Sequence, residues 1–275
     1  MRRLLIGLLL AGCTALARPA SATPPAADPF PRVAAAYLVQ VNGDAAPLWA
    51  KQATRRLPPA SLTKLMTALL LLDAPQPYPS QAVVVISRNA ARETGTRLGV
   101  RPGERFRLAD LLAATVLESA NDACHALAEH VAGSEARFVE HMNRRAAELG
   151  MRDTHFANAC GHDAADHYST AQDLALLANA ALKLPTLSEL AALDKQDIAT
   201  LDGGRAFTLK NRNALIGRYP GAVGLKSGYT PRAGKCLIAH ARRGKTSVLL
   251  VLLNAPNRWW DATDILDLAF AHEGG

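Results

Sequence analysis

The segment Pro59-Ala-Ser-Leu-Thr-Lys-Leu-Met-Thr67 runs directly into an apolar stretch that ends at Leu72. We expect a helix over residues 61–73, because leucine, alanine and methionine favour helix and the stretch contains no breaker. In such a helix Ser61 and Lys64 lie one turn apart on the same face. Apolar residues cover nearly every other direction around the helix axis, which predicts a buried helix.

The spacing of Ser61 and Lys64 brings a hydroxyl and an amine within reach of each other. Burial removes the hydration that favours the ammonium form, so we expect the pKa of Lys64 to be lowered. A neutral amine can accept the hydroxyl proton and make the serine nucleophilic without a histidine. The pair is therefore a candidate for a catalytic nucleophile and its base.

Two further motifs extend this candidate site. Ser119-Ala-Asn121 lies at the junction of two apolar segments that we expect to be helical, and Lys226-Ser-Gly228 lies in a short extended run over residues 223–230. A serine–lysine pair followed in order by S-x-N and K-[ST]-G is the motif set of serine acyl-transferases that react with penicillin. The ordered set favours catalysis over coincidence.

The chain is similar to the low-molecular-mass penicillin-binding proteins of the D-alanyl-D-alanine carboxypeptidase family. The similarity runs from about residue 33 to residue 270 and includes segments outside the three motifs, namely 138–143, 149–155 and 167–174. Two residues depart from the family pattern. Ser227 stands where threonine is usual and also supplies a hydroxyl, whereas His162 stands where a leucine commonly follows Gly161 and can alter the loop beside the site.

The resemblance implies the reaction and the catalytic residues. Ser61 would attack the carbonyl between two terminal D-alanines, with neutral Lys64 as its base. Ser119 would relay a proton to the departing amine, and water would then hydrolyse the acyl-enzyme. The backbone N–H groups of Ser61 and Tyr229 would hold the oxyanion.

The same resemblance implies how the substrate is held. Asn121 would fix the substrate amide, and Lys226 and Ser227 would recognise the terminal carboxylate. Gly228 would let the substrate lie close along the strand edge because it has no side chain. With Tyr229, these are the expected substrate-binding residues.

Strand patterns lie near both ends of the chain and helical patterns lie between them. The run 34–41 turns at Asn42-Gly43, a strong hairpin signal, and the runs 235–241 and 246–253 flank another short turn. The segments expected to be helical are 61–73, 108–117, 120–132, 135–149, 170–182 and 261–271. We predict an α/β (α+β) fold of the β-lactamase/transpeptidase type, in which one antiparallel sheet built from both chain ends is flanked by helices, with a helical subdomain.

The N-terminus has the pattern of an export signal. Two arginines precede a short apolar core, which is too short to span a bilayer permanently. Cleavage after Ala22 would give a signal peptide, 1–22, and a proline-rich flexible lead-in, 23–31. The motif that ends at Cys13 resembles a lipobox, so lipidation of Cys13 is the alternative. In both cases we expect an exported, periplasmic protein.

The remaining residues, 32–275, are expected to form one DD-peptidase domain. No later segment has the uninterrupted apolar length of a membrane span. Typical family members continue into a second β domain and an amphipathic membrane anchor. We expect both to be missing from this chain, because it ends soon after Phe270.

Composition bounds the partners. The formal net charge is +7, but basic residues are not interleaved with aromatic ones, so we expect no nucleic-acid partner. His162 and His167 form only a weak ligand pattern, and neither a metal nor a cofactor is expected. The expected partners are peptidoglycan stem peptides that end in D-Ala-D-Ala, and β-lactam antibiotics as acylating inhibitors.

Three cysteines follow the signal peptide, and disulfides persist in an oxidising periplasm. Cys124 lies one helical turn beyond Asn121, and Cys160 adjoins the loop that the resemblance places beside the site. Two states remain open: a Cys124–Cys160 disulfide with Cys236 free, or three buried thiols.

Three other functions compete with the carboxypeptidase. A DD-endopeptidase that cleaves peptidoglycan cross-links uses the same residues and remains open. A class A β-lactamase usually has E-x-x-x-N after S-x-N for fast deacylation, and no such motif occurs between Ser119 and Lys226. A non-catalytic wall-binding module would have no need for Ser61 and Lys64 together.

Overall fold

The computed structural model describes residues 28–73 and 78–273. The expected signal peptide, Cys13 and the lead-in up to residue 27 lie outside these residues. Within the described part of the chain, no single helix is both long and apolar enough to cross a membrane. The consecutive helices Ala171–Leu182 and Pro185–Ala192, which are bent by 103° against each other, reach the length and apolar composition of a membrane span only when they are taken together.

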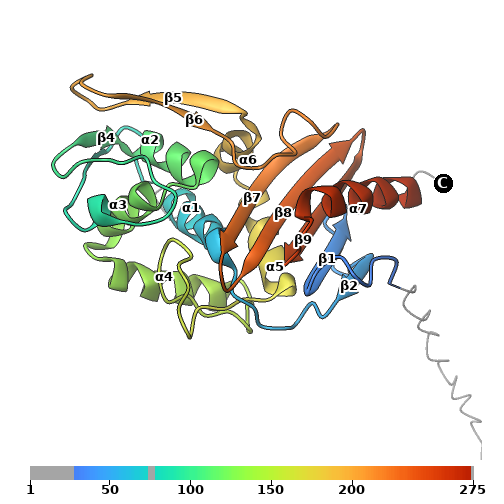
Figure 1. Cartoon of the computed structure of the whole chain (residues 1–275). Coiled ribbons are helices and arrows are strands. Elements are labelled where there is room, and N and C mark those ends of the chain that lie inside the picture. Colours follow the sequence, from blue (N-terminus) through green and yellow to red (C-terminus); the bar gives the residue numbers. More distant parts are fainter. Residues whose placement is uncertain (1–27, 74–77, 274–275) are drawn as a thin grey trace, which may run out of the picture.

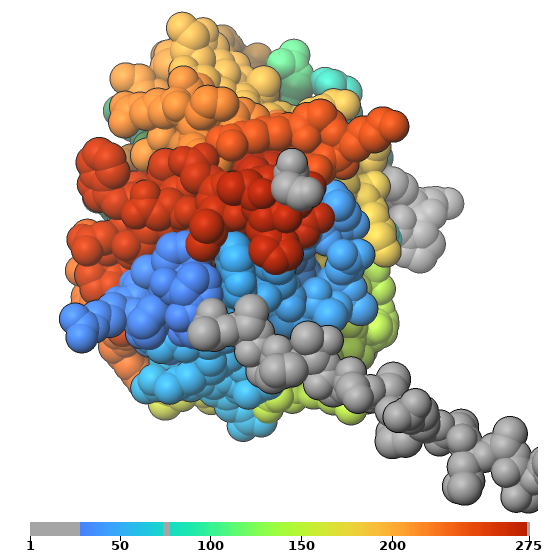
Figure 2. All heavy atoms as spheres, turned by 90° about the vertical axis from the view of Figure 1, so that its right-hand side faces the viewer, coloured from blue at the N-terminus to red at the C-terminus, as the bar shows by residue number. Residues whose placement is uncertain are grey.

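One antiparallel sheet is assembled from the two ends of the chain (Figure 1), which confirms the predicted fold class. Its strand order is β2-β1-β9-β8-β7. The strands are β1 Ala36–Val41, β2 Trp49–Lys51, β7 Ala222–Thr230, β8 Gly234–Arg243 and β9 Thr246–Leu253. The predicted hairpin at Asn42-Gly43 joins β1 to β2. Figure 2 shows the C-terminal residues, in red, lying beside the N-terminal part of the described chain, in blue.

The sheet separates two hydrophobic cores, and successive side chains of β9 enter the two cores in turn. Leu249, Val251 and Leu253 point into one core, whereas residues 248, 250 and 252 point into the other. Side chains on a strand alternate between faces, so a continuous apolar run such as β9 is buried on both sides. The first core is shared with helices α1 Lys64–Leu72 and α5 Ala171–Leu182, and the second is closed by α7 Arg258–Glu273.

A helical part lies beside the sheet and packs on α1 (Figure 1). Its helices are α2 Leu108–Ala113, α3 Asn121–Ala132 and α4 Glu135–Glu148. Leu65, Met66 and Leu69 of α1 have no exposed surface. The prediction that this helix is buried is therefore confirmed.

Several elements differ from the sequence prediction. The expected helix 61–73 is divided into a 3-10 turn, η1 Ala60–Thr63, followed by α1, and the expected helix 108–117 changes after α2 into a π turn, η3 Ala114–Glu118. The elements not predicted are η2 Ala90–Arg92, α6 Pro185–Ala192, β4 Arg105–Arg107, which pairs with β3 Val83–Val85, and the hairpin of β5 Lys195–Ala199 with β6 Ala206–Lys210. These elements are too short for their periodicity to stand out, and α6 begins with a proline, which favours the first turn of a helix.

Candidate active site

The turn that carries Ser61 is held between β7 and the loop at residues 158–162. Ala60 has a φ of 51°, which is uncommon for a residue with a side chain and is typical of functional sites. A Cβ on Gly228 of β7 would lie 2.9 Å from the Ser61 nitrogen, and one on Gly161 would lie 2.1 Å from the Ala60 oxygen. Only glycine at both positions lets the two segments approach the turn.

Lys64 lies buried beneath Ser61, with 1% of its surface exposed. Its Nζ donates to Ser61 Oγ at 3.1 Å, to Asn121 Oδ1 at 2.7 Å and to the carbonyl of Cys160. Burial, followed by the charge of Lys226, holds the pKa of Lys64 well below its ordinary value. The structure therefore brings together a hydroxyl and an amine that can accept its proton.

The S-x-N motif lies between η3 and α3. Ser119 is buried and takes a left-handed conformation, with a φ of 62°. Asn121 is the first residue of α3; its Nδ2 donates to the Thr94 carbonyl at 2.6 Å, and its backbone N–H donates to the Thr96 carbonyl at 2.7 Å. With its Oδ1 on Lys64, both ends of the Asn121 amide are fixed. π turns occur frequently at functional sites, because they redirect a helix locally.

β7 is the edge strand of the sheet and carries the K-S-G motif. Lys226 is 2% exposed, and burial, with the charges of Arg258 and Arg212, lowers its pKa to about 7. Ser227 Oγ donates to the carbonyl of Arg212 at 3.2 Å. Tyr229 is 62% exposed. The structure thus places the second lysine close to two guanidinium groups.

Arg258, at the start of α7, is a residue that sequence reasoning missed. Its Nη1 donates to the carbonyl of Gly228 at 2.6 Å and to that of Cys236 at 3.2 Å. Its guanidinium therefore links β7 to β8, and it adds positive charge near Lys226. No motif in the sequence marks this arginine, because its partners are backbone carbonyls.

A cleft of about 650 Å³ opens in front of Ser61. Six separate parts of the chain line it: Ser61, residues 95–97, Asn121, residues 160–163, Arg212 and residues 229–231. Ser61, Asn121 and Tyr229, which line the cleft, are catalytic or substrate-binding candidates from the sequence, and Cys160 is the disulfide candidate. Tyr229 and Thr230 of β7 are among the lining residues, so the cleft lies beside the edge strand of the sheet.

A second group of titratable residues borders this cleft and was also missed. Glu93 Oε1 accepts from His125 Nδ1 at 2.7 Å, and Glu93 Oε2 accepts from His162 Nε2 at 2.8 Å. Partial burial alone would raise the pKa of Glu93, but the two histidines outweigh it and lower the pKa to about 2. For His125 the directions are reversed. Burial alone would lower its pKa, but Glu93 and two further glutamates outweigh burial and raise the pKa of His125.

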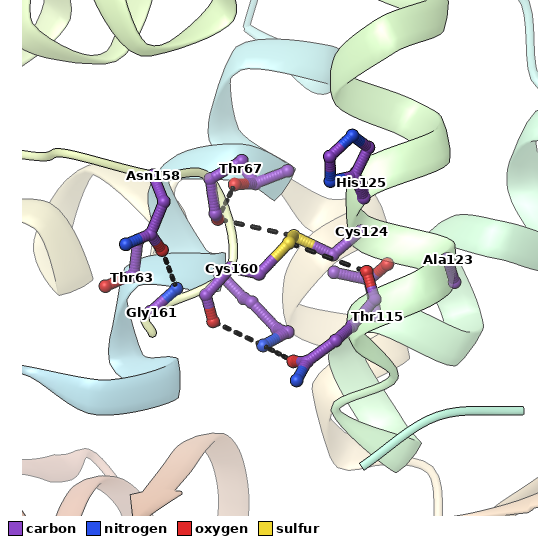
Figure 3. Close-up of a disulfide and its surroundings, with 12 residues drawn as sticks. Thr63, Thr67, Thr115, Ala123, Cys124, His125, Asn158, Cys160 and Gly161 are labelled. Carbon is purple, nitrogen blue, oxygen red and sulfur yellow. Dashed lines mark hydrogen bonds between the residues drawn. A yellow bond between two sulfur atoms is a disulfide. The ribbon is translucent and has the colours of Figure 1, made fainter. Parts of the chain in front are cut away.

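In the structure, Cys124 and Cys160 are joined by a disulfide, and their Cα atoms lie 5.9 Å apart. Figure 3 shows that it ties the loop of Asn158 and Gly161 to the helix that carries His125. The residues are 36 apart in sequence, a loop to which the entropic model assigns roughly 3–4 kcal/mol. Cys236 is free and buried, and burial raises its pKa to about 11. The disulfide thus stabilises the loop whose carbonyl binds Lys64.

The sequence and the fold are both similar to those of known proteins. The chain is 36% identical over 229 residues to the Bacillus subtilis D-alanyl-D-alanine carboxypeptidase DacF, covering 82% of this chain and 59% of that protein. It is 30% identical over 263 residues to a Pseudomonas aeruginosa D-alanyl-D-alanine endopeptidase, covering 94% and 84%. A solved Streptomyces DD-transpeptidase mutant aligns with a TM-score of 0.81 at 30% identity, covering 87% of this chain and 98% of that one.

These likenesses agree on the family. The chain spans about half the length of several curated relatives that it matches. The family model described as D-alanyl-D-alanine carboxypeptidase matches residues 24–257. The chain therefore belongs to the D-alanyl-D-alanine carboxypeptidase family.

Proposed function

We propose that this protein is a serine-type D-Ala-D-Ala carboxypeptidase that trims peptidoglycan stem peptides through an acyl-enzyme on Ser61. The observation that carries the proposal is the contact between Lys64 Nζ and Ser61 Oγ, at 3.1 Å in a buried site. A buried amine of lowered pKa is a base that can act on its neighbouring hydroxyl at neutral pH.

Acylation follows from this contact. Neutral Lys64 takes the proton of Ser61 as the hydroxyl oxygen attacks the carbonyl between the terminal D-alanines. The backbone N–H groups of Ser61 and Tyr229 stabilise the oxyanion. Ser119 relays a proton to the nitrogen of the leaving D-alanine. Gly228 supports this scheme, because a Cβ there would lie 2.9 Å from the Ser61 nitrogen and crowd the oxyanion.

Substrate binding uses the β7 edge. An unpaired edge strand can accept an extended peptide as an additional strand, and β7 is the last strand in the sheet order. Asn121 holds the substrate amide from the opposite side of the cleft. Lys226 and Ser227 recognise the terminal carboxylate, and the bound anion favours the charged form of Lys226. Water then hydrolyses the acyl-enzyme, without a cofactor.

Ser61 would also be acylated by β-lactam antibiotics, because the lactam resembles the scissile amide. We place the action outside the cytoplasm, where peptidoglycan lies. This placement is supported by the expected signal peptide, with lipidation of Cys13 as the alternative.

A DD-endopeptidase is the second candidate function. It is supported by the similarity to the Pseudomonas aeruginosa endopeptidase, which covers more of this chain than the similarity to DacF does. Both activities need the same nucleophile and base, so the difference lies in which peptide the cleft accepts.

Product analysis separates the two candidates. The purified protein is incubated with a D-Ala-D-Ala pentapeptide and, separately, with a cross-linked peptide dimer, and the products are identified by mass spectrometry. We expect release of free D-alanine from the pentapeptide, with Ser61→Ala as the inactive control. Faster conversion of the dimer to monomers would favour the endopeptidase, and turnover of neither substrate would contradict both.

A further inference from the structure

Glu93 lies where three segments around the active site meet, yet it belongs to none of the three motifs. It follows η2 and is the residue before the segment 94–97 that lines the cleft. Its carboxylate accepts hydrogen bonds from His125 on α3 and from His162 in the loop 158–162. A carboxylate that accepts two bonds from ring N–H groups fixes the orientation of both rings.

The first segment holds Asn121. The carbonyl of Thr94 accepts from Asn121 Nδ2 at 2.6 Å, and the carbonyl of Thr96 accepts from the Asn121 backbone at 2.7 Å. A Cβ on Gly95 would lie 3.1 Å from Asn121 Nδ2. The position of segment 94–96, which directly follows Glu93, therefore sets the position of the amide that contacts Lys64.

The second segment supplies the Cys160 carbonyl, another acceptor of Lys64 Nζ. Asn158 Oδ1 accepts from the backbone N–H groups of Gly161 and His162, at 2.7 and 2.9 Å. The loop is therefore tightly turned. The ring of His162 binds Glu93 and so holds one side of the loop. On its other side it is anchored to α3 through the disulfide.

The third segment is α3 itself. His125 lies one turn beyond Asn121 on this helix, and its ring contacts Glu93 at 2.7 Å and Glu129 at 3.4 Å. The side chains of Glu93 and His125 are only 14% and 11% exposed, so their contact is little screened by water. Glu93 thus joins α3 to the loop 158–162 through its contacts with His125 and His162.

We propose that Glu93 is a positioning residue of the active site, clasped between His125 and His162 so that Asn121 and the Cys160 carbonyl stay on the amine of Lys64. The inference rests on the proposed role of Lys64 as base. Glu93 has no contact with Ser61 and does not itself line the cleft. It therefore acts through the groups that hold Lys64.

The proposal has a pH signature. The charged groups that act on Lys64 are Lys226 on β7, Asp122 on α3 and Glu93, and the two carboxylates raise the Lys64 pKa against the effects of burial and of Lys226. Removing the Glu93 charge lowers the Lys64 pKa further, so the neutral base persists to lower pH. The acidic limb of the acylation profile should therefore move to lower pH, a shift that general loosening of the fold would not produce.

The test compares Glu93→Gln with Glu104→Gln in the full mature chain. The two glutamates match closely: their side chains are 14% and 15% exposed, and both oxygens of Glu104 are also hydrogen-bonded, to the Arg101 backbone and to Arg205. The rate of acylation by a fluorescent penicillin is measured from pH 5 to 10. We expect a rate about 10- to 100-fold lower for Glu93→Gln, with the acidic limb moved to lower pH, and no more than about a twofold change for Glu104→Gln.

Each other outcome decides the question. A Glu93→Gln rate within about twofold of the wild type, an unmoved acidic limb, or equal losses in both variants would overturn the proposal. If Glu93→Gln does not fold, His162→Ala decides, because this side chain is 36% exposed and its loss removes one of the two contacts. A slower acylation rate for His162→Ala supports the proposed positioning role of Glu93, and an unchanged acylation rate overturns it. A wild type that penicillin does not acylate would instead contradict the proposed function.

Discussion

Replacing Lys64 with alanine is expected to lower the rate of Ser61 acylation by roughly 10²- to 10⁴-fold, the range in which general-base catalysis contributes. The variant removes the amine that lies 3.1 Å from Ser61 Oγ and leaves no other amine in contact with that hydroxyl among the described residues. The rate of labelling by a fluorescent penicillin, measured at several concentrations, gives the second-order constant.

Asn121→Ala is the comparison for this prediction. It removes a group that contacts Lys64 at 2.7 Å but keeps the base, so it should retain more activity than Lys64→Ala. Thermal melting of both variants checks that each is folded. Near-normal acylation in folded Lys64→Ala would mean that the base must be sought elsewhere.

Gly161→Ala is expected to lower the free energy of unfolding by about 2–4 kcal/mol, since it combines a left-handed backbone with overpacking. Gly161 has a φ of 89°, and its Cβ would lie 2.1 Å from the Ala60 oxygen and 2.9 Å from the Ser61 nitrogen. Both neighbours are backbone atoms, so relieving the clash requires the turn that carries Ser61 to move. Acylation should fall with stability.

Gly150→Ala separates the two causes. Gly150 has a φ of 78° and nothing within 4 Å of its added Cβ, so only the backbone cost remains, about 1–2 kcal/mol. Denaturant unfolding of both variants provides the comparison. Equal losses of unfolding free energy in the two variants would contradict the close contact between the loop at Gly161 and the turn that carries Ser61.

Local patterns explain why so much of the fold could be predicted. The apolar run in β9 and the Asn42-Gly43 turn are signals carried by neighbouring residues, and both produced the expected strands. The division of the first expected helix could not be predicted, because the left-handed Ala60 is imposed by β7 and by the loop at Gly161. These contacts come from distant parts of the chain.

The candidate site shows the same limit. Ser61 and Lys64 lie within one helical turn, so their spacing alone places them together. Glu93 instead meets partners 32 and 69 residues away, and no local pattern joins them. One signal was available: His162 departs from the family pattern, and the structure shows that its ring binds Glu93.

The most direct test of the central claim is to locate the covalent adduct that penicillin forms. The protein is labelled, digested and mapped by tandem mass spectrometry, with Ser61→Ala treated in parallel. We expect one adduct, on Ser61, and no label in the variant. An adduct on another residue, or labelling that persists in Ser61→Ala, would contradict the assignment of Ser61 as the nucleophile.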